Sequence, residues 1–198
     1  MSSTDVWLVV GLGNPGPDYA HTRHNVGYLV VQVLAGRLGA SWKRHRTGRA
    51  DTVDGRLGTP GAGPTARVLL VRPRSFMNES GAPVSAVAAY WSIEPDHLIA
   101  VHDELDLERG TLRVKFGGGD NGHNGLRSVR RGLGTGDFHR VRVGIGRPSG
   151  CQDPSDFVLS SWSARERPDR DVVVERAADA VQSLVLRGLT LTQSDFNG

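Results

Sequence analysis

The sequence contains almost no cysteine and no long apolar stretch. Cys151 is the single cysteine among 198 residues, which excludes an internal disulfide framework and favours a reducing compartment. No run of apolar residues is long enough to span a bilayer, and the first residues lack a basic segment followed by an apolar one. These absences predict a soluble, cytoplasmic protein with no membrane contact.

The signatures of several enzyme classes are missing as well. The glycine-rich stretch at 116–126 does not end in Gly-Lys-Ser/Thr, which disfavours a nucleoside triphosphatase of the P-loop type. No Gly-x-Ser-x-Gly elbow is present and no motif surrounds Cys151. A covalent serine or cysteine mechanism therefore has no visible nucleophile.

One nucleotide-binding pattern is present in form only. Residues 11–16 match G-x-G-x-x-G after an apolar run, but Pro15, Gly16 and Pro17 delay the helix whose N-terminus would hold a pyrophosphate. No acidic residue ends a second strand at the distance needed for a ribose hydroxyl. A nicotinamide-dependent oxidoreductase therefore remains an alternative, and thermal stabilisation by that cofactor would support it.

Short apolar or β-branched runs alternate with helical periodicity along the chain. The strand signals lie at 6–10, 67–71, 97–102, 111–115 and 140–145, with weaker ones at 41–46 and 49–53. The helical patterns lie at 26–38, 83–91, 126–133 and 171–187. A glycine- and proline-rich stretch, 59–64, predicts a hairpin tip. The alternation predicts one α/β domain over residues 1–198, with a mostly parallel, twisted mixed sheet flanked by helices on both faces.

A polar loop follows the first predicted strand, where ligands usually bind in α/β folds. Its hydrogen-bonding side chains include Asn14, Tyr19, His24 and Asn25. His24 is a candidate general base because imidazole titrates near neutral pH. Asp103 follows another apolar strand and is the best candidate to orient that imidazole at the same sheet edge. Glu104 and Asp106 compete for this role on sequence alone.

Two further loops carry groups that suit a substrate. Phe76 and Met77 fit either core packing or stacking on a base or sugar. Asn78 fits a ligand contact or a helix N-cap. The glycine-rich stretch at 116–126 exposes backbone amides that suit a lid or an anion-binding nest, and Asn124 offers a carboxamide to a developing oxyanion.

Histidines and carboxylates near the strand signal at 97–102 could suggest a metal site. The residues that such a site would use are His102, Asp103, Glu104 and His123. No pair among them has a recognised ligand spacing, so no metal is expected.

The net charge of +3 is mildly basic, but the cations are clustered. The clusters are Lys43, Arg44, His45, Arg46 and Arg49; Arg113 and Lys115; Arg127, Arg130 and Arg131; and Arg140, Arg142 and Arg147. Any one cluster fits a solvated surface. Several clusters around one glycine-rich loop favour a polyanionic partner.

Taken together, these segments resemble bacterial peptidyl-tRNA hydrolases. The matching stretches are 11–16, 19, 22–27, 76–81, 103–106, 122–126, 138–146 and 196–197. Their joint occurrence in this order along nearly the whole chain is specific. The resemblance implies a monomeric enzyme without a cofactor that hydrolyses the ester between a peptide and the 3′-terminal ribose of tRNA.

The resemblance also implies roles for individual residues. His24 falls on the catalytic histidine, Asp103 on its aspartate partner, and Asn14 completes the catalytic set. The implied substrate-binding residues are Tyr19, Phe76, Met77, Asn78 and Asn124, and the implied tRNA-binding residues are Lys115, Arg142 and Arg113. A tRNA-binding module without catalysis is the remaining alternative, but the intact His24 and Asp103 argue against it.

Overall fold

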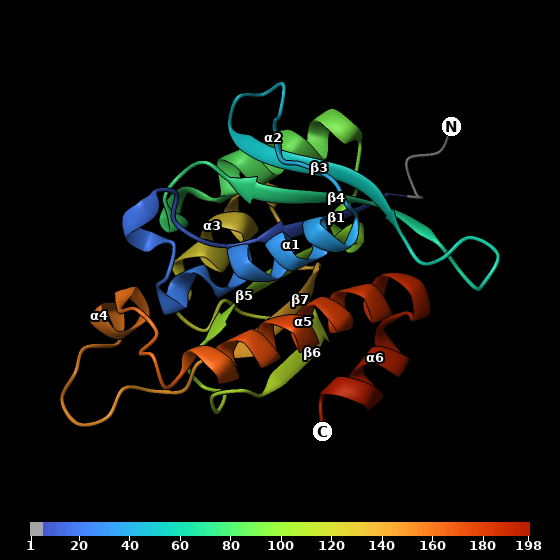
Figure 1. Cartoon of the computed structure of the whole chain (residues 1–198). Coiled ribbons are helices and arrows are strands. Elements are labelled where there is room, and N and C mark those ends of the chain that lie inside the picture. The colour runs from blue at the N-terminus through green and yellow to red at the C-terminus, as the bar shows by residue number, and fades with distance from the viewer. Residues whose placement is uncertain (1–5) are drawn as a thin grey trace.

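A seven-stranded sheet with the order β2-β3-β4-β1-β5-β7-β6 forms the centre of the protein (Figure 1). The computed structural model describes residues 6–198. The strands are β1 (Val6–Gly11), β2 (Lys43–Arg44), β3 (Ala50–Leu57), β4 (Ala66–Pro73), β5 (Leu98–Glu104), β6 (Leu112–Phe116) and β7 (His139–Gly144). The central strands β4, β1, β5 and β7 are parallel, whereas β3 and β2 at one edge and β6 at the other are antiparallel. The predicted mixed α/β sheet is confirmed, with its parallel part at the centre.

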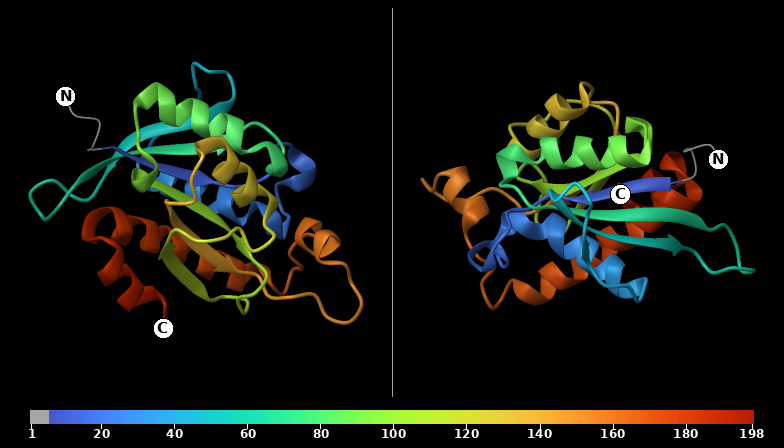
Figure 2. Two further views of the ribbon diagram at one scale, coloured as in Figure 1. Left: turned by 180° about the vertical axis from the view of Figure 1, so that it is seen from behind. Right: turned by 90° about the horizontal axis from the view of Figure 1, so that it is seen from above.

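Helices cover both faces of this sheet, as predicted (Figure 2). One face carries α1 (Val26–Arg37) and α5 (Arg167–Arg187), and the other carries α2 (Gly81–Trp91) and α3 (Asn124–Leu133). Two short helices lie outside these layers, α4 (Pro154–Leu159) and α6 (Leu189–Phe196). Single 3₁₀ turns are η2 (Pro17–Tyr19), η3 (Arg23–Asn25), η4 (Met77–Glu79) and η5 (Pro95–His97).

The apolar run of β1 is buried because both faces of a central strand are covered. Successive side chains point to opposite faces, so Leu8 and Val10 join the core under α2 and α3, while Val9 joins the core under α1 and α5. All three side chains are fully buried. The strand therefore carries no alternation of polar residues and serves as a rigid base for the loop that follows it.

Two glycines let α1 lie directly against the sheet. A Cβ atom on Gly11 would approach the Gly27 carbonyl oxygen to 2.3 Å, and one on Gly27 would approach the Val101 carbonyl oxygen to the same distance. Both separations are too short for a side chain, so only glycine permits this contact. The close contact brings η3, just before α1, against the carboxyl end of β5.

Most of the predicted elements are confirmed, with small shifts at their ends. The stretch 59–64 lies at the tip of the β3–β4 hairpin. The short helices α4 and α6 were not predicted from periodicity. Asn197 follows α6, accepts a hydrogen bond from the Val114 amide at 2.6 Å and donates one to the Val114 carbonyl at 3.0 Å, which satisfies the free edge of β6. Within residues 6–198 no helix combines the length and the hydropathy needed to cross a membrane.

Candidate active site

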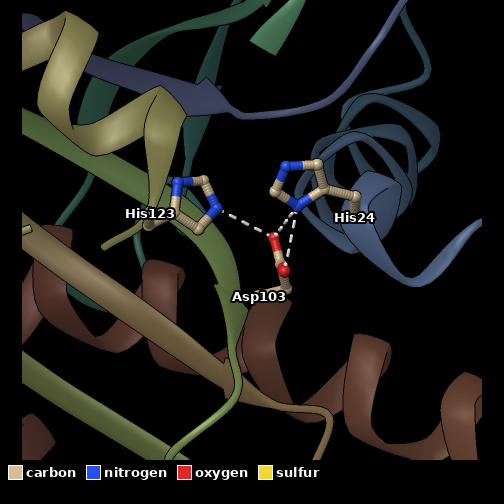
Figure 3. A group of neighbouring side chains, drawn as sticks. All are labelled: His24, Asp103 and His123. Carbon is tan, nitrogen blue, oxygen red and sulfur yellow. Dashed lines mark hydrogen bonds and ion pairs between the residues drawn. The ribbon is translucent and has the colours of Figure 1, made fainter. Parts of the chain in front are cut away.

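The polar loops meet at the carboxyl ends of the central parallel strands. The loop after β1 supplies Asn14 and η3, the loop after β4 supplies η4, and β5 itself ends in Asp103 and Glu104. Figure 3 shows that His24, Asp103 and His123 converge here from three different segments. Parallel strands explain the meeting, because their carboxyl ends lie at one edge of the sheet.

His24 and Asp103 form a buried pair. Nδ1 of His24 lies 2.9 Å and 3.0 Å from the two carboxylate oxygens of Asp103, and the residues are 8% and 2% exposed. A carboxylate only accepts hydrogen bonds, so Nδ1 carries the proton and Nε2 of His24 keeps a free lone pair. This is the tautomer that a general base requires.

The charge of Asp103 sets the titration of this pair. Burial lowers the pKa of His24, but the charge of Asp103 and its hydrogen bond more than offset burial, so the pKa lies above 6.5. Burial raises the pKa of Asp103, but His24 and His123 outweigh it and hold the pKa well below its ordinary value. Asp103 is therefore ionised throughout the physiological range.

His123 is a second imidazole on the same carboxylate. Its Nδ1 accepts the backbone N–H groups of Gly125 and Leu126 at 3.1 Å and 3.2 Å, which makes it the N-cap of α3. Nε2 of His123 must therefore carry the proton, which it donates to Oδ1 of Asp103 at 2.9 Å. Sequence reasoning treated His123 only as a possible metal ligand; its position just before a helical pattern was the signal of a cap.

The same cluster bears on the metal question. Ligand atoms of His24, Asp103 and His123 all lie within 4.8 Å of one another. The α3 amides place the His123 proton on the nitrogen that faces Asp103, so this nitrogen has no lone pair for a cation in the hydrogen-bonded arrangement. The geometry fits a hydrogen-bond network better than a metal centre.

The competing carboxylates bind elsewhere. Glu104 accepts hydrogen bonds from Arg142 at 3.0 Å and 3.1 Å. Asp106 accepts from Arg147. Within the described chain neither carboxylate is bonded to His24, which leaves Asp103 as its partner.

Asn14 is held rigidly against the segment that carries His24, through the neighbouring residue Asn25. The Asn25 side chain accepts the Asn14 N–H at 2.8 Å and donates to the Asn14 carbonyl at 2.9 Å. Oδ1 of Asn14 accepts the Met77 N–H at 2.7 Å. The side-chain nitrogen of Asn14 is thereby left as the donor for a ligand. Asn25, expected only as one of the polar side chains of this loop, supports Asn14.

A pocket of about 460 Å³ opens over His24 and Asp103. Its walls come from β5, the glycine-rich loop and α4, and include Glu104, Leu105, Asn121, Gly122, His123, Asn124, Arg147, Asp153, Pro154, Ser155 and Val158. Asn124 thus lies in the wall of the pocket that contains His24. The sequence did not identify α4 as a wall of this site.

The remaining predicted substrate residues lie on η4 or directly before it, except Tyr19, which lies on η2. Phe76 is 52% exposed and meets the Tyr19 ring edge-on at a centroid distance of 6.0 Å. Met77 is buried. Asn78 is exposed and lines a separate crevice that does not include His24. Asn78 and Asn124, both predicted to bind substrate, thus line different crevices.

Arg23 clamps the catalytic turn to the segment after α4. It is 7% exposed, and its guanidinium donates to both carboxylate oxygens of Glu166 at 2.9 Å. It also donates to Ser160 and to the carbonyl of Ser161, and it packs over the rings of Phe157 and Trp162. Sequence reasoning missed Arg23, although a charged residue directly before a candidate base was a visible signal.

The predicted tRNA-binding cations lie at the β6 edge of the sheet. Arg113 pairs in register with Arg142 and Lys115 with Arg140, so the four side chains share one face of β6 and β7. Like charges placed opposite one another are unfavourable for folding. Arg140 is buried and donates to glycine-rich-loop carbonyls, whereas Lys115 remains partly exposed. This strip is therefore suited to an external anion.

An orienting carboxylate, a histidine with a free nitrogen and fixed carboxamides, set at the carboxyl edge of an α/β sheet, form a candidate active site of the kind that hydrolases use. The chain belongs to the peptidyl-tRNA hydrolase family, whose model, described as "Peptidyl-tRNA hydrolase", matches residues 8–198.

Similarity to known proteins, which extends over nearly the full length of the chain, supports this assignment. The peptidyl-tRNA hydrolase of Streptomyces coelicolor is 54% identical over 191 residues, covering 96% of this chain and 94% of the relative. That of Mycolicibacterium smegmatis is 51% identical over 187 residues, covering 94% and 95%. The crystal structure of peptidyl-tRNA hydrolase from Acinetobacter baumannii superimposes with a TM-score of 0.85 at 35% identity, covering 100% of this chain and 97% of that one.

Family membership confirms the predicted reaction. The chain is an enzyme that hydrolyses peptidyl-tRNA, an ester substrate, and tRNA is part of what it binds. This result excludes the alternative of a nicotinamide-dependent oxidoreductase. The structure also explains why the glycine pattern misleads, because its first glycine packs against Gly27 and α1 begins only at Val26.

Proposed function

We propose that His24 is the general base of this hydrolysis and that Asp103 positions it. Nε2 of His24 takes a proton from water while the water oxygen bonds to the ester carbonyl carbon. The bond to the ribose oxygen then breaks, His24 returns the proton to that oxygen, and the products are free tRNA and a peptide acid. The observation that carries the proposal is the pair of Nδ1–carboxylate contacts at 2.9 Å and 3.0 Å, which leaves Nε2 free.

Carboxamides supply the remaining catalytic contacts. Asn14 has its oxygen occupied by the Met77 amide, so its NH₂ group is the donor that orients the water or stabilises the oxyanion. Asn124, in the wall of the pocket over His24 and Asp103, is the second donor. Tyr19, Phe76, Met77 and Asn78 hold the substrate beyond the ester. An ester has a better leaving group than an amide, so a positioned water without a metal is chemically sufficient.

The tRNA part of the substrate lies along the β6 edge. Lys115 and Arg113, on β6, offer cations to phosphates there. Arg142, opposite Arg113 on β7, is already bonded to Glu104. We further propose that residues 1–198 act as one domain, as a monomer, in the cytoplasm where translation supplies the substrate.

The decisive experiment separates chemistry from binding. His24→Ala should lower the rate of peptidyl-tRNA hydrolysis about 10²–10⁴-fold, the typical contribution of general-base catalysis. Its affinity for uncharged tRNA should stay within about twofold of the unmodified enzyme, since His24 lies outside the basic strip. Full turnover by this variant would overturn the assignment of the base.

A further inference from the structure

A second crevice, larger than the catalytic pocket, lies between the β2–β3 hairpin and helices α2 and α3. Its volume is about 860 Å³. Four arginines line it, Arg44, Arg49, Arg74 and Arg131, against a single carboxylate, Glu79. We call this crevice the arginine groove. Among the residues given a role in the proposed function, only Asn78 lines it.

The charges in the arginine groove are available to a ligand. Arg74 is paired with Asp51 at 3.2 Å, and Arg44 donates to the Gly48 carbonyl. Across residues 6–198, no carboxylate oxygen lies within 4.0 Å of Arg49 or Arg131. Both side chains are exposed and line the groove, and neither has an ion-pair partner in the described chain; Arg131 also lines the neighbouring crevice beside Asp120.

The hairpin wall of the groove is held in place. His45, between Arg44 and Arg49, is only 8% exposed. Its Nε2 accepts the indole N–H of Trp91 at 3.3 Å, and its ring packs edge-on against Tyr90 at 4.9 Å. The two arginines are thereby carried by a loop anchored to the end of α2, which reduces the entropy lost when they bind a ligand.

The strand order places the arginine groove opposite the tRNA strip. Arg113 and Lys115 lie on β6 at one edge of the sheet, whereas the hairpin of β2 and β3 is the other edge. Asp103, on β5, lies between them. The η4 segment leads from the active site to the groove, because Met77 binds Asn14 while its neighbour Asn78 lines the groove.

The order of the strands indicates which part of the substrate reaches the arginine groove. An ester has two substituents, and the tRNA leaves the catalytic residues toward β6 and β7. The peptide therefore extends toward β4, β3 and the groove. Guanidinium groups recognise carboxylates through paired N–H donors, with a geometry that ammonium groups cannot copy.

We propose that the arginine groove is a subsite for acidic side chains of the peptide, giving the enzyme a preference among peptidyl-tRNAs. The inference rests on the proposed function, because the direction of the peptide follows from where the ester and the tRNA lie. It adds a substrate class that the catalytic residues alone do not define.

Three substrates test the proposal. They share one tRNA and one ester-linked residue and differ in the four residues that precede it, which are all glutamate, all glutamine or all lysine. We expect kcat/KM to fall in the order glutamate, glutamine, lysine, with about a threefold to tenfold span, as for a few exposed charge pairs. Equal values for the three substrates would overturn the subsite.

A double variant assigns the effect to the groove. Arg49→Gln with Arg131→Gln should bring the glutamate substrate to the level of the glutamine substrate and leave the glutamine substrate unchanged. Arg176→Gln, on α5 across the sheet, is the matched control and should keep the full preference. Both arginines of the variant are exposed, and a thermal melt verifies that the fold is intact.

Other results point elsewhere. If the double variant lowers kcat/KM equally for all three substrates and flattens the salt dependence, the groove binds tRNA phosphates and the peptide subsite is refuted. Full turnover of the glutamine substrate by His24→Ala would instead refute the catalytic proposal, whatever the order of the three substrates. The two failures are thus distinguishable in one series.

Discussion

The catalytic edge and the arginine groove hold their charged side chains in opposite ways. Asp103 is 2% exposed and accepts from two imidazoles, and Arg23 is 7% exposed and bonded to Glu166. Arg49 and Arg131 are exposed and lie in an open crevice. Removing one member of a buried, bonded pair leaves its partner without a hydrogen bond in a medium of low dielectric constant. When an exposed charged side chain is removed, water takes its place. Buried charges thus fix catalytic geometry, and exposed ones adjust affinity.

The largest effect should follow from changing Asp103. In Asp103→Asn the charge that stabilises the protonated form of His24 is lost, and the amide no longer selects one tautomer. We expect kcat to fall about 10²–10⁴-fold. Single-turnover hydrolysis of a peptidyl-tRNA measures this loss. An undiminished rate would contradict the conclusion that buried charges fix the catalytic geometry.

The pH dependence of the same variant sharpens the test. The pKa of His24 lies above 6.5 in the unmodified enzyme, and only its unprotonated form acts as a base. The value of kcat/KM should therefore rise with pH and level off above that raised pKa. With Asp103 neutralised, burial alone acts on His24 and the inflection should move to lower pH. An inflection that stays in place would mean that another group titrates.

Arg23 should have the next largest effect, on stability. Arg23→Ala removes the two-pronged partner of Glu166, which keeps Arg109 and Ser163, and we expect the free energy of unfolding to fall by about 2–3 kcal/mol. Arg37→Ala is the control, because Arg37 pairs with Glu175 and Asp179 but its side chain is 30% exposed. The control should lose about 1 kcal/mol or less. Urea unfolding followed by circular dichroism measures both.

Acid should reduce this stability difference. Burial acts to raise the pKa of Glu166, but hydrogen bonds from Ser163 and Arg23 lower it to about 2. A depressed carboxyl pKa contributes stability above the ordinary value of 4.5 and loses it as the pH falls toward 2. The cost of Arg23→Ala should therefore be constant near neutral pH and decline below about pH 4. A cost independent of pH would place the role of Arg23 in packing alone.

Changing His123 should have an intermediate effect, on both the stability of the fold and the pH dependence of kcat/KM. His123→Ala removes the cap of α3 and one donor to Asp103, and we expect about 1 kcal/mol of lost stability. The carboxylate, with one donor fewer, should raise the pKa of His24 further and move the inflection of kcat/KM to higher pH. His123→Asn keeps a capping side chain and should restore most of the stability. Equal stability of the two variants would contradict the capping role.

The sequence predicted the meeting of His24 and Asp103 because both follow strands that end at one edge of a parallel sheet. The positions of His123 and Arg23 depended on information that periodicity does not carry. His123 reaches Asp103 through a glycine-rich loop with several residues at positive φ, and Arg23 acts on a segment more than a hundred residues away. Asn78 lies on a 3₁₀ turn, where adjacent side chains diverge, so Met77 points inward and Asn78 lines the groove.

The smallest effect should come from the partly exposed cations on β6 and β7, and it separates Lys115 from Arg142, for which the sequence analysis expected the same role. Lys115→Gln removes a cation with no carboxylate within 4.0 Å in the described chain, so the slope of log affinity for tRNA against log salt should decrease by about 0.9. Arg142 is already bonded to Glu104 at 3.0 Å, and that carboxylate is 5% exposed. Arg142→Gln should therefore change the slope less and destabilise the fold more, because it leaves Glu104 buried and unpaired. If Arg142→Gln alone changes the slope, Arg142 must leave Glu104 when tRNA binds, and it would then belong with the exposed cations.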